Sequence, residues 1–485
     1  MTEGVREQVA AVLDAVQLVV LGYLVLVTVT SVALVAIGGV VVGRRLRRSS
    51  PDEHDALFAN PLTPAVSIVV PAHDEEAVIV ASVRSLLALH YPELEVVVVD
   101  DGSTDATFAR LEEAFDLVPV HRVLSGEVPV IGRPTSVHAA RDGRPLVVVR
   151  KPATGRRADA LNVGITAARH PLVCMVDADS LLEEDALLRV VGPFVDDPVR
   201  TVAAGGAVRP VNGARVELGR VVAPRVPASA LPAIQVVEYL RSFLFGRTAW
   251  SRLGALLVIS GSFGVFRRDV LVEVGGVDLD CIGEDAELVT RIHARLRAQG
   301  RPYRMVFLAE PVCWTEVPST LRVLGRQRRR WSRGLAEVLW RHRAMLGSPR
   351  YGTVGLLAMP YMLVVELLSP VVEAAGLAVT VLGLATGLVD PALAGLVALV
   401  ALGYGVLLSL VALAAEELSY HRYPRWRDLG LALAAAVLEN LGYRQLHAWW
   451  RLQGLMSFVL RRKMGWGVMQ RQGFSPDPGG TVQAG

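Results

Sequence analysis

The sequence predicts an α/β domain with a mostly parallel, doubly wound sheet, joined to α-helices that cross a membrane. Short Val-rich runs alternate with helical patterns between residues 65 and 319, as in sheets whose strands are connected by helices. Aspartates follow several of these runs, at the edge where the carboxyl ends of parallel strands form ligand sites. Long uncharged stretches flank this region, and apolar residues make up 52% of the 485 residues, a high share for a soluble protein.

The N-terminal apolar segment is predicted to be an uncleaved membrane anchor. Residues 15–43 carry no charge, follow a short tail of residues 1–14, and exceed the roughly 20 residues that span a bilayer. Four arginines follow within residues 44–48, whereas Arg6 is the only basic residue before the segment. A signal peptide has the reverse layout. The positive-inside rule therefore predicts that the chain from residue 44 onward is cytoplasmic.

The first strand–helix unit argues against a dinucleotide cofactor. After a basic linker of residues 44–64, residues 66–70 form a predicted strand, and the following turn contains Asp74, Glu75 and Glu76. A dinucleotide-binding turn has glycines here, which let a pyrophosphate approach the backbone. Acidic side chains repel phosphate, so we expect no nicotinamide or flavin at this turn.

Two further units place polar side chains at the same edge of the predicted sheet. Their elements are strands 95–99 and 146–149 and helices 106–115 and 158–168. Asp100 and Asp101 follow the first of these strands. Arg157 and Asp159 lie where a basic, polar loop enters the helix after the second strand. We therefore expect these side chains to face one ligand site.

Two aspartates follow the next buried strand, predicted over residues 172–176. Asp177 and Asp179 are spaced i, i+2, so in an extended chain they point to the same side, roughly 6.6 Å apart. Paired carboxylates suit a hard cation such as Mg²⁺ or Mn²⁺, which can then bind phosphate oxygens. The alternative is that the two aspartates only cap the next turn or helix.

Two segments before residue 300 are open to a structural or a functional interpretation. Glu284 and Asp285 precede a helix predicted over residues 286–298, where they would at least complement the helix dipole. A helix predicted from Gln235 to Arg247 carries several polar residues, to which the sequence assigns no role.

Residues 320–350 are predicted to form a basic amphipathic helix at the membrane interface. Arginines alternate with Leu, Val and Trp over this segment, a composition that favours anionic lipid surfaces. Nucleic-acid binding is the competing interpretation of a basic run. The hydrophobic chain that begins at Tyr351 favours the membrane, so we expect no nucleic-acid partner.

The C-terminal part is predicted to be membrane-embedded over residues 351–448. Residues 371–389 and 392–415 are expected to be spans, whereas 356–368 and 429–441 could be short spans or surface helices. Residues 449–485 are predicted to be a basic, aromatic interfacial segment with a disordered tail. Three cysteines without paired spacing argue against a disulfide framework or zinc site.

Four motifs occur in a fixed order and carry a family resemblance. They are Asp100-Asp101-Gly102-Ser103, Asp177-Ala178-Asp179, Gly283-Glu284-Asp285 and Gln327-Arg328-Arg329-Arg330-Trp331. Together they resemble the membrane-bound processive family 2 glycosyltransferases, which include the synthases of cellulose, chitin, hyaluronan and poly-N-acetylglucosamine. The resemblance implies a Rossmann-like GT-A domain over residues 65–319 that binds a nucleotide-diphosphate sugar.

The resemblance implies a role for each motif. Asp100 or Asp101 would contact the nucleobase and ribose; Asp177 and Asp179 would hold the diphosphate and its metal, with Asp179 the closer ligand; Gln327 and Arg330 would face the diphosphate; Asp285, after Glu284, would be the general base; and Trp331 would face the acceptor sugar. We also expect Arg157, Asp159 and Arg328 to contact the donor. The small residues Gly261 and Ser262 would let the acceptor approach closely, although a plain turn is the alternative.

Two positions depart from the family pattern. Arg156 and Arg157 stand before Ala158, where relatives usually have Gly-Lys. Arginine binds phosphate through a planar fork and lysine as a point charge, so the donor contacts can differ here. Gly283 stands where relatives often carry threonine.

These observations predict an inverting glycosyltransferase of the plasma membrane with a cytoplasmic catalytic domain. Transfer from a UDP-sugar needs a cation at the leaving group and a base at the acceptor hydroxyl. One base without a second carboxylate nucleophile favours single displacement. The expected product is a β-linked polysaccharide, and the close alternative is transfer of one sugar to a lipid-linked carrier. A non-catalytic receptor or scaffold would not need these clustered carboxylates. A transporter is disfavoured because the predicted spans are few and lack paired buried charges beyond Glu366, Glu373 and Glu439.

Overall fold

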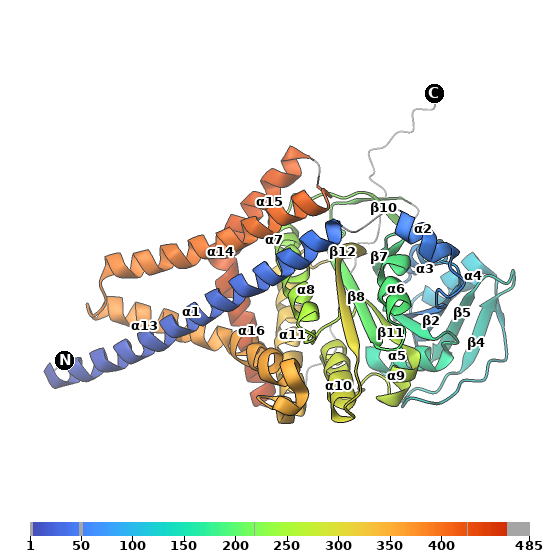
Figure 1. The fold of residues 1–485 in the computed structure, drawn as a ribbon, viewed down its shortest axis with the longest axis horizontal. Coiled ribbons are helices and arrows are strands. Elements are labelled where there is room, and N and C mark those ends of the chain that lie inside the picture. Colours follow the sequence, from blue (N-terminus) through green and yellow to red (C-terminus); the bar gives the residue numbers. More distant parts are fainter. Residues whose placement is uncertain (1–2, 48–51, 218, 424, 463–485) are drawn as a thin grey trace.

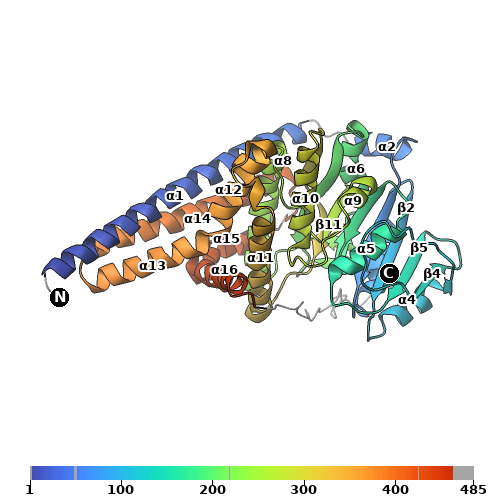
Figure 2. The ribbon, with the colours of Figure 1, turned by 90° about the horizontal axis from the view of Figure 1, so that it is seen from below.

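A computed structural model describes residues 3–47, 52–217, 219–423 and 425–462. Figures 1 and 2 show a sheet covered by helices at one end of the molecule and long helices that project from it at the other. The helices between these two parts connect the sheet to the projecting ones.

The main sheet has ten strands in the order β3-β4-β5-β2-β1-β6-β11-β8-β12-β7. Its strands are β1 (Val66–Ala72), β2 (Leu94–Asp101), β3 (Leu117–Pro119), β4 (Ser136–Ala140), β5 (Leu146–Lys151), β6 (Leu172–Val176), β7 (Ser180–Leu182), β8 (Thr201–Pro210), β11 (Phe263–Arg267) and β12 (Arg304–Thr315). The central strands β5, β2, β1 and β6 are parallel, and antiparallel strands lie on both sides of them. A small second sheet pairs β9 (Arg215–Glu217) with β10 (Arg220–Ala223).

The chain order reverses at β1, which lies between β2 and β6. In sheets of this kind, ligands bind outside the carboxyl ends of the strands at such a switch point. The register places Asp100 beside Arg150 and Asp101 beside Lys151 at these ends of β2 and β5.

The four strands expected from Val-rich runs are β1, β2, β5 and β6, and all four are present. The flanking strands were not predicted. Strand β8 carries Gly205 and Gly206 at its centre, because Ile259 and Val312 occupy the space that Cβ atoms would need there. The small residues of β8 are therefore required by side chains that are distant in the sequence, and they do not form a recognisable strand pattern.

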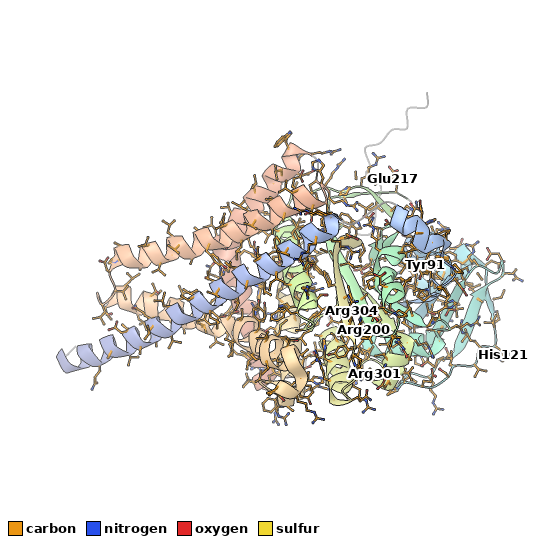
Figure 3. The ribbon with its side chains drawn as sticks, viewed as in Figure 1. Tyr91, His121, Arg200, Glu217, Arg301 and Arg304 are labelled. Carbon is orange, nitrogen blue, oxygen red and sulfur yellow. The ribbon has the colours of Figure 1, made fainter. Side chains whose placement is uncertain are left out.

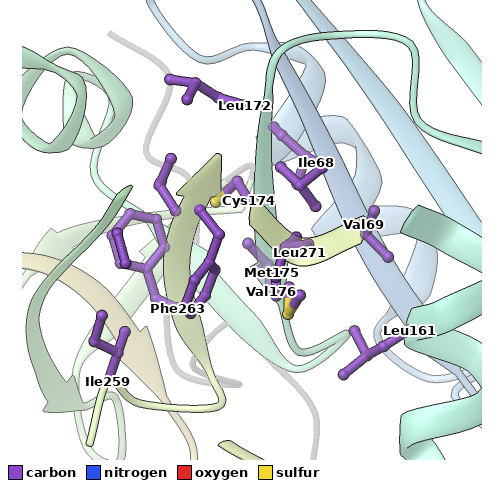
Figure 4. Packing of buried hydrophobic residues seen from close by; sticks show 14 of the residues in the cluster. Ile68, Val69, Leu161, Leu172, Cys174, Met175, Val176, Ile259, Phe263 and Leu271 are labelled. Atoms are coloured by element: carbon purple, nitrogen blue, oxygen red, sulfur yellow. The ribbon is translucent and has the colours of Figure 1, made fainter. Parts of the chain in front are cut away.

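The core lies on the two faces of this sheet. Figure 4 shows Ile68 and Val69 of β1, Cys174 of β6 and Phe263 of β11 among its packed side chains. All three cysteines are free and buried.

Seven helices surround or border the sheet domain in the described chain. They are α2 (Asp52–Ala59), α3 (Ile79–Leu87), α4 (Thr107–Phe115), α5 (Arg157–Ala167), α6 (Ala186–Asp196), α9 (Arg268–Glu273) and α10 (Glu284–Ala298). Helix α5 lies so close to β1 that a Cβ on Gly164 would approach Cγ1 of Val69 to 2.1 Å. This contact fixes α5, with Arg157 at its N-terminal end near the carboxyl ends of the strands.

Connecting helices lie between the sheet and the projecting helices. They are α7 (Ala230–Leu240), the π-helical segment η1 (Arg241–Arg247), α8 (Thr248–Arg252), α11 (Leu321–Arg341), η2 (Arg343–Met345) and η3 (Pro349–Tyr351). Helix α11 was predicted to lie at the membrane interface. Its apolar residues Leu324 and Leu339 are buried against the rest of the protein, whereas Trp340 is 61% exposed, so its position at a membrane interface stays a prediction.

The membrane-side helices are longer than predicted at the N-terminus and less interrupted after residue 351. They are α1 (Glu3–Leu46), η4 (Val354–Ala358), α12 (Met359–Tyr361), η5 (Met362–Leu367), α13 (Ser369–Ala385), α14 (Pro391–Ser419), α15 (Trp426–Leu438), η6 (Glu439–Tyr443) and α16 (Arg444–Val459). Residues 3–14, predicted as a tail, continue the α1 helix, since they contain good helix formers next to an apolar span. Part of the predicted linker 44–64 forms α2.

Three helical stretches in the described residues are long and apolar enough to cross a membrane: Ala11–Leu46, Val354–Ala385 and Ala394–Ser419. The uncertain segment 356–368 belongs to the second stretch, in which π-helical turns flank Pro360. The other uncertain segment, 429–441, lies mostly in α15. This helix packs on α7 through Ala432 and Ala436 and is not one of the three stretches. The predicted tail from Phe474 lies outside the described residues, as does the predicted interfacial segment from residue 463 onward.

Candidate functional site

A cavity of about 2610 Å³ begins at the carboxyl ends of the strands and continues between the membrane-side helices. Its wall includes Asp101 at the sheet end and Tyr23 of α1 at the other. Most of the predicted site residues line it: Asp101, Arg157, Asp177, Asp179, Gly261, Ser262, Glu284, Asp285, Gln327, Arg328, Arg330 and Trp331. Residues from four separate motifs therefore meet on one wall.

Two predicted site residues, Asp100 and Asp159, do not line the cavity. Asp100 is 1% exposed, accepts a hydrogen bond from the Ser103 backbone N–H at 2.9 Å and lies 3.3 Å from Nε of Arg150. Asp159 is fully buried and lies 3.0 Å from Nζ of Lys151. The geometry therefore gives both carboxylates partners inside the domain.

Lys151 connects the buried Asp159 to Asp101 on the cavity wall. Its ammonium group is fully buried and forms ion pairs with both carboxylates. Burial raises the pKa of Asp101 above its usual value, although Lys151 opposes this shift. Asp101 is thus held in place by a lysine on the neighbouring strand, with one side open to the cavity.

Arg157 joins three parts of the wall. Its Nη2 lies 2.6 Å from Oδ1 of Asp177, and its Nη1 lies 3.1 Å from Oε1 of Glu284. Nη2 also donates to the backbone carbonyl of Gly261 at 2.7 Å. Burial alone would lower the pKa of Arg157, but Asp177 and Glu284 outweigh it and raise that pKa. One guanidinium therefore links the aspartate pair after β6 to the start of α10.

Asp177 and Asp179 are the residues that could hold a divalent cation, and they supply only part of its coordination shell. Asp177 and Asp179 follow β6 and line the cavity. The side chain of Asp177 is 31% exposed, and Asp179 as a whole residue is 6% exposed. In the described residues, no group of three or more His, Cys, Asp or Glu side chains could hold a metal ion. The oxygen donors fit Mg²⁺ or Mn²⁺, provided that a bound ligand supplies further oxygens.

Asp285 faces the small-residue loop. A Cβ built on Gly261 would lie 3.6 Å from Oδ2 of Asp285, so the glycine leaves space beside this carboxylate. Oδ1 of Asp285 accepts the Ala286 backbone N–H at 2.8 Å, as expected at a helix start. Its neighbour Glu284 is 8% exposed, and burial raises its pKa, partly offset by Arg157.

Gly283 has a packing reason for its departure from the family pattern. A Cβ at this position would lie 3.1 Å from the backbone carbonyl carbon of Gly334 in α11. The two glycines let α11 approach the start of α10 closely. A threonine at residue 283 would separate the two helices.

Helix α11 presents the last motif to the cavity. Burial lowers the pKa of Arg330, although Glu284 and Asp177 oppose this shift, so the guanidinium lies near both carboxylates. Trp331 is 44% exposed, and the guanidinium carbon of Arg328 lies 4.6 Å from the centre of its ring. Arg328 was predicted to contact the donor, but its Nη2 lies 2.6 Å from Oε2 of Glu238.

The sequence did not assign a role to the α7–η1 segment, which also lines the cavity. Glu238, Arg241 and Arg247 reach the wall from this segment, where the helix widens into a π-helical turn. Burial lowers the pKa of Arg247 to about 10. Charged residues on an otherwise apolar helix were the only available signal, and π-helical turns often occur at functional sites.

Two family models match this chain. The model described as "Glycosyl transferase family 2" matches residues 67–275, and that described as "Glycosyl transferase family group 2" matches residues 172–412. Together they include the aspartate pair, the start of α10 and the α11 motif.

Two curated proteins illustrate the similarity. The chain is 27% identical over 277 residues to the probable glycosyltransferase YdaM of Bacillus subtilis (strain 168), covering 56% of this chain and 55% of that protein. It is 28% identical over 278 residues to the poly-beta-1,6-N-acetyl-D-glucosamine synthase of Staphylococcus aureus (strain COL), covering 57% and 56%. The matches thus span about half the length of these relatives.

A solved structure shares the fold. The mannosyltransferase PcManGT from Pyrobaculum calidifontis, in complex with GDP-Man and Mn²⁺, has a TM-score of 0.54 and 21% identity, covering 90% of this chain and 99% of that one. The family models, which together match residues 67–412, show that the chain belongs to the family 2 glycosyltransferases, and the solved structure shows that its fold is of the GT-A type.

Proposed function

We propose that the protein transfers sugar from a UDP-sugar to a growing β-linked polysaccharide at the cytoplasmic face of the plasma membrane. The observation that carries this proposal is the cavity that joins the carboxylates at the sheet edge to the membrane-side helices. A donor bound at the carboxylates would be reached from the cytoplasm, while an acceptor would extend toward the membrane.

The donor would lie between the sheet edge and α11. Asp101, which lines the cavity, would contact the nucleobase and ribose. Asp177 and Asp179 would hold Mg²⁺ or Mn²⁺, and Arg157, Gln327 and Arg330 would face the diphosphate. The cation would offset the charge of the leaving diphosphate. The Mn²⁺ in the PcManGT complex supports a divalent ion in general.

Asp285 would act as the general base. Its carboxylate faces the space beside Gly261, whereas Glu284 is buried against Arg157. The acceptor hydroxyl would give its proton to Asp285 as its oxygen bonds to the anomeric carbon. The bond from that carbon to the diphosphate would break, and UDP would leave with the electron pair. A single displacement of this kind inverts the anomeric configuration.

Trp331 would hold the acceptor sugar. Its ring is 44% exposed on the cavity wall, and aromatic faces suit the apolar faces of sugars. Similarity to a poly-N-acetylglucosamine synthase favours a polymer product. The alternative acceptor is a lipid-linked carrier. It is favoured by the apolar part of the cavity wall, which Val20 and Leu24 of α1 contribute.

The test is turnover of the purified protein in lipid with a panel of UDP- and GDP-sugars. We expect nucleotide release and a polymer that size-exclusion chromatography separates from the donor, with one UDP-sugar and Mg²⁺ or Mn²⁺. A product that extracts into organic solvent would favour the lipid-linked alternative. Release of GDP alone would refute the UDP assignment.

The metal is tested in the same assay. EDTA should abolish turnover, and Asp179→Ala should lose donor binding because the diphosphate would face Asp177 without a bound cation. Asp185→Ala, which removes a partly buried ion pair with Arg189 away from the cavity wall, is the control and should keep both. Full activity in EDTA would refute the metal assignment.

A further inference from the structure

We infer that Glu238 and Tyr443 are positioning residues that hold the Arg328–Trp331 pair at the acceptor end of the cavity. The inference rests on the proposed role of Trp331 in acceptor binding. It assigns a function to a polar group in the C-terminal helices beyond residue 412, where the family models end.

The contacts form a continuous chain. The hydroxyl of Tyr443 donates to Oε2 of Glu238 at 3.2 Å, and Nη2 of Arg328 donates to the same oxygen at 2.6 Å. The guanidinium of Arg328 then lies over the Trp331 ring at 4.6 Å. All four residues line the same cavity. The position of the ring is thus connected through Arg328 and Glu238 to Tyr443.

The two charged residues in this series of contacts are both largely buried. The side chain of Arg328 is 7% exposed and that of Glu238 is 13% exposed, so each charge depends on the other for compensation. A guanidinium bound at one edge by a carboxylate can still present its flat face to an aromatic ring. Arg328 therefore acts through Trp331 and not on the diphosphate.

Three separate elements supply these residues. Glu238 lies on α7, Arg328 and Trp331 on α11, and Tyr443 at the end of η6. The backbone leaves helical geometry just before Tyr443, with Gly442 at φ 84°, a conformation that favours glycine. This kink between α15 and α16 directs the chain so that the Tyr443 hydroxyl reaches Glu238.

The inference predicts that substitution of Glu238 weakens acceptor binding and leaves donor binding unchanged. If Glu238 loses its charge, Arg328 loses the contact that orients it, and the Trp331 ring becomes less fixed. Acceptor binding should then weaken, while the aspartate pair and Arg157, which do not contact Glu238, should still bind donor and metal. The expected phenotype is a shorter product at a normal donor KM.

The test uses Glu238→Gln and Tyr443→Phe in the full-length protein in lipid. We expect Glu238→Gln to raise the acceptor KM about tenfold and shorten the product, as for the loss of one charge-assisted hydrogen bond. Tyr443→Phe should act in the same direction with a smaller effect. Because both act through one carboxylate, the double variant should resemble Glu238→Gln alone. The donor KM should stay within about twofold in each variant.

Glu439→Gln is the matched control. Glu439 is 8% exposed at its side chain and lines the same cavity, but its ion-pair and hydrogen-bond partners are Arg241 and Ser409 and not Arg328. It should change stability without changing product length. If Glu439→Gln shortens the product as Glu238→Gln does, or if Glu238→Gln changes donor and acceptor KM equally, the positioning role is refuted.

A spectroscopic readout keeps the inference separate from the proposed function. Trp331 emission, taken as the difference between each protein and its Trp331→Phe counterpart, should change in Glu238→Gln but not in Glu439→Gln. This holds whichever sugar and acceptor the enzyme uses. An unchanged Trp331 emission would refute the positioning role, whereas absence of UDP release in the wild type would refute only the proposed donor.

Discussion

Arg157 determines how charge is arranged around the residues beside the cavity. Its guanidinium binds Asp177 on one side and Glu284 on the other, while Asp285 faces Gly261. The same guanidinium also donates to the backbone carbonyl of Gly261. A lysine, as a single point charge, could not bind Asp177, Glu284 and this carbonyl with the same geometry. Arg157 thus holds Glu284 in an ion pair, whereas the carboxylate of Asp285 faces the space beside Gly261, as its proposed role as a base requires.

Asp285→Asn should keep the fold and donor affinity while losing catalysis. A general base typically contributes about 10²–10⁴-fold, so we expect a loss of that size in kcat. The rival explanation is that Asp285 only complements the dipole of α10, worth about 0.3–1 kcal/mol. UDP release and thermal stability measured on the same variant distinguish these explanations.

Asp269→Asn is the control for the dipole effect. Asp269 occupies the first turn of α9 and accepts the Val270 backbone N–H at 2.8 Å, as Asp285 accepts that of Ala286. This variant should lose a little stability and keep kcat. Near-normal turnover in Asp285→Asn would exclude it as the base.

His293 should make the fold sensitive to acid. It is buried, lies 2.8 Å through Nε2 from the Leu256 carbonyl oxygen, and burial lowers its pKa to about 4. Between about pH 6.5 and 4 the unfolded chain binds a proton that the folded protein does not, so stability falls as pH falls through this window. The pKa difference from an ordinary histidine corresponds to about 3 kcal/mol. Thermal unfolding at pH 7.5 and 5 should show about 2 kcal/mol of this difference, because pH 5 lies inside the window.

His293→Gln should have a weaker pH dependence in that window, although its stability at pH 7.5 will also be lower. His121, an exposed histidine at the far edge of the sheet domain in Figure 3, is the control position. His121→Gln should keep the pH dependence of the wild type. An equal pH dependence in wild type and His293→Gln would contradict the assignment.

At the scale of elements, the position of α11 depends on α16. A Cβ on Gly454 would lie 2.4 Å from the Arg329 carbonyl oxygen, and one on Gly325 would lie 2.7 Å from Nε1 of Trp450. Ser332 donates through Oγ to the Arg451 carbonyl oxygen at 2.7 Å. Since α11 carries Gln327 to Trp331, the spacing of these two helices sets the wall of the cavity.

Gly454→Ala should therefore destabilise the protein by about 1–3 kcal/mol, the usual effect of overpacking. It should also lower turnover by displacing α11. Gly430→Ala is the matched control, because a Cβ on Gly430 of α15 meets nothing within 4 Å. That substitution should be neutral or stabilise by about 0.5–1 kcal/mol. Equal melting temperatures for the two variants would contradict the packing argument.

The sequence predicted elements whose pattern is local and missed those that depend on distant neighbours. Val-rich runs identified β1, β2, β5 and β6, whereas the small residues of β8 have meaning only beside Ile259 and Val312. The same holds within the site. Most residues of the predicted site lie on the cavity wall, but the ion pair between the buried Asp159 and Lys151 could not be predicted. Nor could the pairing of Arg328 with Glu238, from a helix 90 residues earlier.

At the scale of the whole molecule, the cavity connects two environments. The sheet domain holds the carboxylates and Arg157, and helices α1, α13 and α14 project away from it (Figure 2). These helices contain long apolar stretches. The family models end at residue 412, yet α15 and α16 complete the packing of α7 and α11. The C-terminal helices α15 and α16 therefore support the site.

The proposed orientation can be tested on intact cells. Arginines within residues 44–48, after the first apolar stretch, predict that the sheet domain is cytoplasmic. The three stretches then place the turn between α13 and α14 on the opposite side of the membrane from residue 121. The native cysteines are buried, so an introduced cysteine should dominate labelling by a membrane-impermeant thiol reagent. Thr386→Cys, exposed in that turn, should label in intact cells.

His121→Cys should label only after the membrane is permeabilised, because the sheet domain would be enclosed with the cytoplasmic UDP-sugars. Labelling of Thr386→Cys in the same cells shows that the reagent reaches the outer surface, so protection of residue 121 cannot be due to poor access from outside. If His121→Cys labels in intact cells and Thr386→Cys does not, the orientation is inverted. The cavity would then open to the outside at its carboxylate end, where nucleotide sugars are absent, and the proposed donor would have to be abandoned along with the orientation.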